Sequence, residues 1–306
     1  MKNFILLLIL TASVFTAGAN KIEARLLGES QDGKTVKLMW FLKKWDKDLI
    51  GFNIKRKDKD NNWVTINDNL IVPEVSMDRN LQNVENNTFE LLRLKSKLKG
   101  LIDAGTLKTS TNEEFANSLL QNADTMKVMT QSFGKDFDLA LLTGFGITDR
   151  NVEVQVEQYA LFLVRNDRGE DKNPTATFNW STGTKTNLNP EIKIFSIPTN
   201  QGTQLVWNLP FKSMETLHAA GFNVYKRINE AWVKINDIPV TEFNNVKNGY
   251  TFYDNNSNGE VMYAVSLATM FNNEGNKKAY LVRNNNSINS DVAKNITPKS
   301  QKGITL

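Results

Sequence analysis

The chain contains no cysteine and only one histidine, His218, among its 306 residues. Without cysteine, neither a disulfide, nor a lipid-modified N-terminal cysteine, nor a Cys-His nucleophile pair can form. A single histidine cannot build a histidine-rich zinc site. We therefore expect no disulfides, no metal and no cofactor, and a fold that is stabilised by its core alone.

Signals for catalysis are equally scarce. There is no Gly-x-Ser-x-Gly nucleophile elbow. His218 lies in METLHAAG, before an expected strand, and is interpreted as an ordinary loop residue. Paired acids for sugar cleavage stay open, because their spacing is spatial and not sequential. We predict no catalytic residue.

The net charge of +4 is small for a chain of this length. Nucleic-acid binding usually shows as a concentrated basic face, so we expect no nucleic-acid partner. Apolar residues make up 40% of the chain, which is typical of globular proteins. The length leaves room for two domains.

The two ends of the chain differ in composition from the rest. Residues 1–19 combine a positive start, an apolar run and the small residues Ala17-Gly18-Ala19, and they predict a cleaved signal peptide. An uncleaved anchor helix is the alternative, although the run is short for a span of about 20 apolar residues. Residues 286–306 are polar and predict a flexible tail. We expect an exported protein without a stable membrane span after cleavage, in a bacterial periplasm, on the cell surface or secreted.

One stretch of the sequence occurs twice. GFNIKRKDKDNNWVTIND, from Gly51 to Asp68, is nearly repeated as GFNVYKRINEAWVKIND, from Gly221 to Asp237. Each copy follows an alternating segment that ends in tryptophan, at Trp40 and at Trp207. Alternation with period two indicates strands with one buried face. Several short strands between polar turns are typical of an antiparallel sandwich.

The second copy resembles the fibronectin type III domains. The resemblance is carried by strand tryptophans, by GFNVYKR, and by an aspartate and tyrosine before an Asn–Gly loop: Trp207, Trp232, Asp254, Tyr263 and Asn272 to Gly275. It covers about residues 190–284, and the first copy only in pieces. It implies a seven-stranded sandwich with a spacer or binding role, and it implies no catalytic residue.

The first copy contains an insertion. Asp68 and Asp149 are 81 residues apart, whereas the equivalent Asp237 and Asp254 are 17 apart. The first copy is therefore about 64 residues longer than the second. The spacing places the insertion at 78–145, between the fourth and fifth strands. Long loop insertions cost little free energy and often carry binding residues.

The insertion has helical periodicity. NTFELLRLKSKLKG predicts a helix that ends at Gly100, and Ser110 with Glu113 has capping-box spacing at the start of a second helix. DFDLALLTG predicts a third. An apolar stripe on the second helix fits either core packing or a ligand surface, and core packing is the more common use: Phe115, Leu119, Met126, Met129 and Phe133.

These patterns predict a mainly β chain of two tandem fibronectin III-like, immunoglobulin-like sandwiches, with a small helical insertion in the first. The expected domains are 20–186, interrupted by 78–145, and 187–285. The short junction that contains Pro190 predicts a semi-rigid connection.

The expected function is an exported non-catalytic binding or structural protein that makes protein–protein contacts, adhesive ones included, in the bacterial envelope or at the surface. The helical insertion is expected to supply the specific contact. The alternative is a hydrolase or polysaccharide-active accessory protein with its site in the helical insertion. A strand-capturing chaperone is a third reading. The binding candidate is Trp45, in KKWDKD, which could stack on a sugar or partner if exposed, or could pack over the sandwich edge.

Overall fold

The computed structural model describes residues 22–43, 45, 47–73, 96, 99–100, 102–105, 111–121, 137–150, 152, 155–199, 202–210, 213–214, 217–237, 239–257 and 259–284. The expected signal peptide 1–19 and tail 286–306 lie outside these residues. Within the described part of the chain, no helix is long and apolar enough to cross a membrane.

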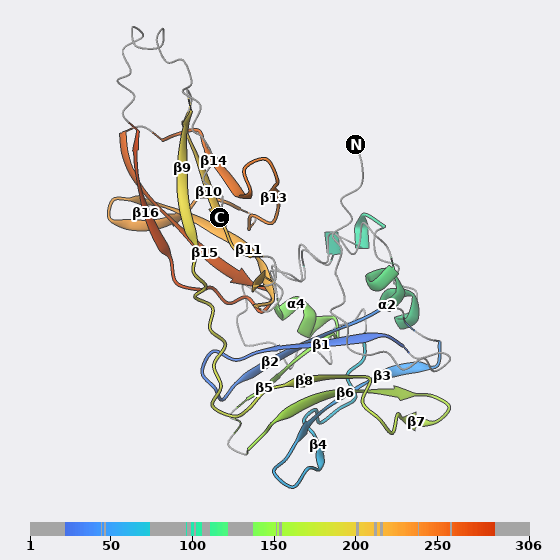
Figure 1. Ribbon diagram of the computed structural model, residues 1–306. Coiled ribbons are helices and arrows are strands. Elements are labelled where there is room, and N and C mark those ends of the chain that lie inside the picture. The colour runs from blue at the N-terminus through green and yellow to red at the C-terminus, as the bar shows by residue number, and fades with distance from the viewer. Residues whose placement is uncertain are drawn as a thin grey trace, which may run out of the picture.

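The first half of the chain folds into two antiparallel sheets (Figure 1). One sheet has the order β1-β2-β5, and the other has the order β4-β3-β6-β7, with β8 also paired to β6. The strands are β1 (Ala24–Glu29), β2 (Val36–Leu42), β3 (Leu49–Lys57), β4 (Trp63–Thr65), β5 (Gly146–Asp149), β6 (Gln158–Arg165), β7 (Gly169–Glu170) and β8 (Ala176–Asn179).

The second half forms two further antiparallel sheets, with the orders β13-β14-β10-β9 and β12-β11-β15-β16. The strands are β9 (Lys193–Thr199), β10 (Gly202–Asn208), β11 (Ala219–Ile228), β12 (Ala231–Lys234), β13 (Phe243–Asn244), β14 (Gly249–Asp254), β15 (Gly259–Thr269) and β16 (Lys278–Asn284). The chain is therefore mainly β, and each half is sandwich-like.

The two halves repeat the same strand order. In the order of strands within the sheets, β1-β2-β5 corresponds to β9-β10-β14, and β4-β3-β6-β8 corresponds to β12-β11-β15-β16. The repeated sequence begins on β3 in one half and on β11 in the other. Both copies therefore occupy equivalent strands, as the repeat predicts.

Equivalent side chains form the two cores. Trp40 lies edge-on to Phe52 with ring centroids 5.5 Å apart, and Trp207 lies edge-on to Phe222 at 5.6 Å. All four side chains are fully buried. Burying such aromatic rings supplies a large share of the hydrophobic stabilisation of each half.

A tyrosine, a carboxylate and a cation join the two sheets in each half. Tyr159 donates to Asp149 Oδ2 over 2.9 Å, and Arg56 Nη1 donates to both oxygens of Asp149. Asp149 lies on β5, whereas Arg56 and Tyr159 lie on β3 and β6 of the facing sheet. Burial, followed by the charge of Asp149, raises the pKa of the Tyr159 hydroxyl, which therefore acts as a fixed donor.

The second half repeats this triad with a lysine in place of the arginine. Tyr263 donates to Asp254 Oδ2 over 2.6 Å, and Lys226 Nζ donates to the same oxygen over 2.9 Å. Burial and the hydrogen bond to Asp254 raise the pKa of the Tyr263 hydroxyl. Asp254 and Tyr263, two of the residues that carry the resemblance, are hydrogen-bonded to each other.

The helices lie between β4 and β5 in the sequence and against the sheet β1-β2-β5 in space (Figure 1). They are α2 (Asn112–Gln121) and α4 (Phe137–Leu142). Phe115, Phe137 and Leu141 are buried in the core of the first half. Gly146 permits the close approach of α4, because a β-carbon there would lie 3.1 Å from the Leu141 nitrogen.

Two expected helix ends were wrong. Thr111 caps α2, because its Oγ1 accepts from the Glu114 amide over 3.1 Å, whereas the expected cap, Ser110, lies outside the described residues. The expected end at Gly100 is wrong because residues 102 and 103 are still helical, and Gly105 takes a positive φ of 67° after them. Of the expected apolar stripe, Phe115 is described and buried. The other four side chains lie outside the described part: Leu119, Met126, Met129 and Phe133.

Candidate functional site

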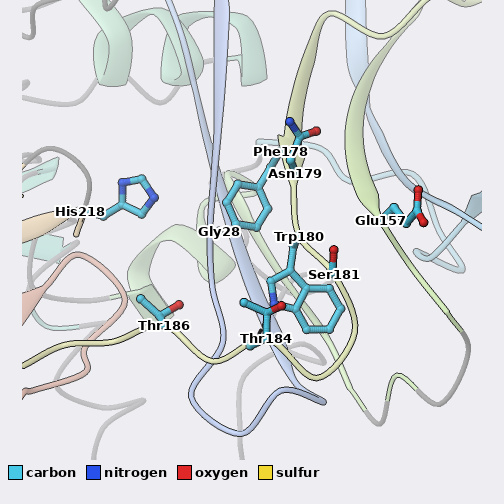
Figure 2. Close-up of a pocket in the computed structure, with 9 residues that line it drawn as sticks. All are labelled: Gly28, Glu157, Phe178, Asn179, Trp180, Ser181, Thr184, Thr186 and His218. Carbon is cyan, nitrogen blue, oxygen red and sulfur yellow. Dashed lines mark hydrogen bonds between the residues drawn. The ribbon is translucent and has the colours of Figure 1, made fainter.

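A groove of about 370 Å³ opens where the first half meets the second (Figure 2). Its walls come from β1, from the residue just before β6, from β8 and the segment after it, and from the residue just before β11. The residues that line it are Gly28, Glu157, Phe178, Asn179, Trp180, Ser181, Thr184, Thr186 and His218. It is more open than enclosed.

The groove floor is aromatic and fixed. The Phe178 ring lies against Gly28, where any β-carbon would collide with it. Trp180 is buried, and its Nε1 donates to the Thr184 carbonyl over 3.0 Å. These contacts hold both rings in place. The accessible apolar surface comes from Phe178, which is half-buried, because Trp180 is only 6% exposed.

The rim is polar. Glu157 and Ser181 are exposed, and His218 is half-buried. Figure 2 shows Glu157 and His218 at opposite ends of the groove, so they do not form an acid–base pair. An apolar floor with separated polar groups on its rim suits an amphipathic ligand such as a polypeptide segment.

A contact between the halves, which we call the seam, lies next to the groove. It consists of Glu29 and Lys37 from the first half and Phe271 and Asn273 from the second. Phe271 is fully buried, and its ring centroid is 5.5 Å from that of Phe137 on α4. Lys37 Nζ donates to the Phe271 carbonyl over 3.1 Å, and Asn273 Nδ2 donates to Glu29 Oε1.

The loop that carries Phe271 is anchored to its own half as well. Tyr225 donates to Glu274 Oε1 over 2.6 Å, and Ser266 donates to the same oxygen. Burial, followed by the hydrogen bond to Glu274, raises the pKa of the Tyr225 hydroxyl. The seam therefore joins two ordered surfaces.

Glu29 has an unusual environment for a carboxylate. It is 1% exposed, and Gln31 Nε2 donates to its Oε1 over 3.2 Å. Its Oε2 is buried and finds no hydrogen-bond partner within the described chain. Burial raises its pKa above the usual 4.5, although the hydrogen bonds and the charge of Lys37 oppose the change.

The stretch GESQDGKT, from Gly28 to Thr35, fits the spacing of nucleotide phosphate loops, a match that reasoning from the sequence missed. A phosphate loop connects a strand to a helix, whereas this stretch connects the antiparallel strands β1 and β2. Asp32 Oδ1 accepts from the amides of Lys34 and Thr35, at 2.7 and 2.6 Å. These bonds lower the pKa of Asp32 to about 2, and they occupy amides that a phosphate would need. The stretch is a hairpin turn.

Other residues singled out from the sequence take structural positions. Trp45 is 7% exposed and lies edge-on to Phe52 at 5.6 Å, so its ring offers no open face for stacking. His218 has a φ of 48°, and its ring centroid is 6.0 Å from that of Phe271. Over the described ranges, no group of three or more histidine, aspartate or glutamate side chains could hold a metal ion.

The seam residues carried no signal in the sequence. Glu29 and Asn273 are 244 positions apart, and a phenylalanine in a polar loop does not predict which core receives it. No protein-family model matches the chain, and no curated protein matches it at a significant level.

Proposed function

We propose that this chain is an exported, non-catalytic binding protein of a bacterial envelope or cell surface that contacts other proteins. In this proposal residues 20–186 and 187–285 are fibronectin III-like domains, and 78–145 is a helical insertion in the first. The observation that carries it is the repeated strand order with its repeated tyrosine–aspartate bond, because the resemblance attaches a spacer or binding role to this arrangement.

We place the contact surface in the groove. The described apolar side chains of α2 and α4 are buried in the core, as Phe115, Phe137 and Leu141 illustrate, so they offer no surface for a partner. The groove instead offers the fixed, half-buried ring of Phe178, with polar residues around it. An extended segment with one apolar side chain over the floor would fit these chemical features.

Site-specific photo-crosslinking tests this placement. A benzophenone amino acid is introduced at Asn179 or Ser181, both exposed at the groove, and the protein is irradiated in cells that naturally produce it. Matched probes are placed at Asp60, on an exposed turn of the first half, and at Lys99, in the helical insertion. Adducts are identified by gel shift and mass spectrometry.

We expect the same envelope protein to be captured from both groove positions and not from Asp60. Capture from Lys99 alone would move the contact to the helical insertion. Equal capture from all four positions, or none from the groove, would contradict the proposed site.

A further inference from the structure

A carboxyl group is buried at the contact between the two halves. Glu29 ends β1, on the face of the sheet β1-β2-β5 that receives the Phe271 loop. One of its oxygens accepts from Asn273 and from Gln31, and the other finds no partner in the described chain. Separating the halves would therefore transfer an almost fully buried acid into water.

The charged and titratable groups around Glu29 come from several elements. Lys37 is its register partner on β2, and the Lys37 Nζ is engaged with the Phe271 carbonyl and lies 5.4 Å from the centroid of the Phe137 ring. On its own strand, Arg25 lies four positions earlier. The segment before β11 contributes His218, which contacts Phe271, and α4 carries Asp138 next to Phe137. The loop itself contributes the Asn273 amide and the Thr269 hydroxyl.

Burial costs more free energy for the ionised form of Glu29 than for its protonated form. An ionised carboxylate loses its hydration when the halves close, and an oxygen without a donor is not compensated for that loss. A protonated carboxyl loses much less. The hydrogen bonds to Oε1 and the charge of Lys37 recover part of the cost for the ionised form, but burial is the larger effect.

We infer that the seam is a proton-linked contact, in which the two halves hold together more tightly when Glu29 is protonated and separate more readily when it is ionised. The groove shares Gly28 and His218 with the immediate surroundings of the seam, so loosening the seam changes the shape of the groove. This inference goes beyond the proposed function, because it holds whatever the groove binds.

The direction of the pH effect follows from linkage. In the separated form Glu29 is solvated and titrates near its usual pKa of 4.5, whereas in the closed form burial raises its pKa. Closure is therefore fully favoured below the usual value and weakens as the pH rises through the raised one. The ratio of open to closed molecules rises up to tenfold for each pH unit between the two pKa values.

Pulsed electron paramagnetic resonance on the full chain tests the inference. Since the chain has no cysteine, D60C and V246C give one nitroxide on an exposed site of each half. Distance distributions are recorded from about pH 4 to about pH 9. We expect one narrow distribution at the acidic end, and a second, longer population that grows as the pH rises.

Substitutions distinguish the contribution of Glu29 to the pH dependence from those of its neighbours. E29Q imitates the protonated acid and should keep the narrow distribution at every pH. E23Q, which removes a carboxylate from the exposed pair with Lys43, should behave like the parent. N273A should broaden the distribution at every pH, and circular dichroism checks that each variant is folded.

Either of two outcomes would overturn the inference. The first is a parent distribution that does not change with pH. The second is a pH dependence that E29Q leaves intact, and its disappearance in H218N, which keeps a residue tolerant of the positive φ, would assign it to His218 instead. An unchanged distribution in N273A would also contradict the role given to the seam.

Discussion

Replacing Phe271 with alanine is expected to lower the free energy of unfolding by about 3–5 kcal/mol. The side chain belongs to the second half of the sequence, yet it is fully buried in the core cluster of the first. Its removal leaves a cavity against Phe137 and His218, the two rings that contact it. Urea titrations followed by circular dichroism measure the loss.

The matched control for this substitution is Phe195→Ala. Phe195 lies on β9, and 44% of its surface is exposed, so its loss should cost less than about 1 kcal/mol. Native-state hydrogen exchange should show faster exchange for F271A in α4 and in the loop around Asn273. Equal costs for the two phenylalanines, or unchanged exchange at the seam, would mean that Phe271 does not join the halves.

Removing the carboxylate from either triad is also expected to lower the free energy of unfolding strongly. Asp149→Ala leaves the buried Tyr159 hydroxyl and Arg56 without their acceptor, and we expect a loss of about 3–5 kcal/mol in unfolding free energy. Asp254→Ala should destabilise the second half by a similar mechanism, because Tyr263 and Lys226 lose theirs. Thermal and urea unfolding measure both.

Glu260→Ala is the control for the triads. Glu260 pairs with Arg283 at the surface, where both side chains are more than half exposed, so the expected loss is below about 1 kcal/mol. If Asp149→Ala or Asp254→Ala cost no more than this control, the triads would not hold the two sheets together.

The second triad also predicts acid sensitivity. Burial favours the neutral form of Asp254, but hydrogen bonds from Tyr263, the Asn256 amide and Lys226 outweigh it and lower its pKa below 3.8. A lowered folded-state pKa gives stability that is present above the usual value and is lost as the pH falls through the lowered one. The unfolding free energy of the parent should therefore fall more steeply on acidification through this range than that of D254A, as urea titrations at several pH values would measure.

The repeated frame could be predicted because its signals are local. Period-two alternation marks strands, and the near-identical segments after Gly51 and Gly221 mark equivalent ones. The difference in spacing before Asp149 and Asp254 placed the helices between β4 and β5, where α2 and α4 lie. Each of these inferences needs only neighbouring residues or one alignment of the chain with itself.

Helix caps were predicted less well because the local signal is ambiguous. Ser110 and Thr111 each precede a glutamate by three positions, so two capping boxes overlap in the sequence. The structure uses Thr111. Propensity alone does not distinguish the two, and the burial of Phe115 on the core is what fixes the orientation of the helix.

The groove and the seam depend on contacts that no local pattern encodes. The charged neighbours of Trp45 left both exposure and packing over the sandwich edge open, and the structure shows that it packs against Phe52. Glutamate is usually found at the surface, but Glu29 is buried because a loop 244 positions away covers it. Such positions become visible only when the tertiary packing is known.

The duplicated frame is tested most directly by two double-mutant cycles, one with D149A and Y159F and one with D254A and Y263F. If both halves use the same bond between their sheets, each cycle should give a favourable coupling within about 0.5–3 kcal/mol. The two couplings should have the same sign and differ by less than about a factor of three. A coupling near zero in either half would show that the halves are not built in the same way.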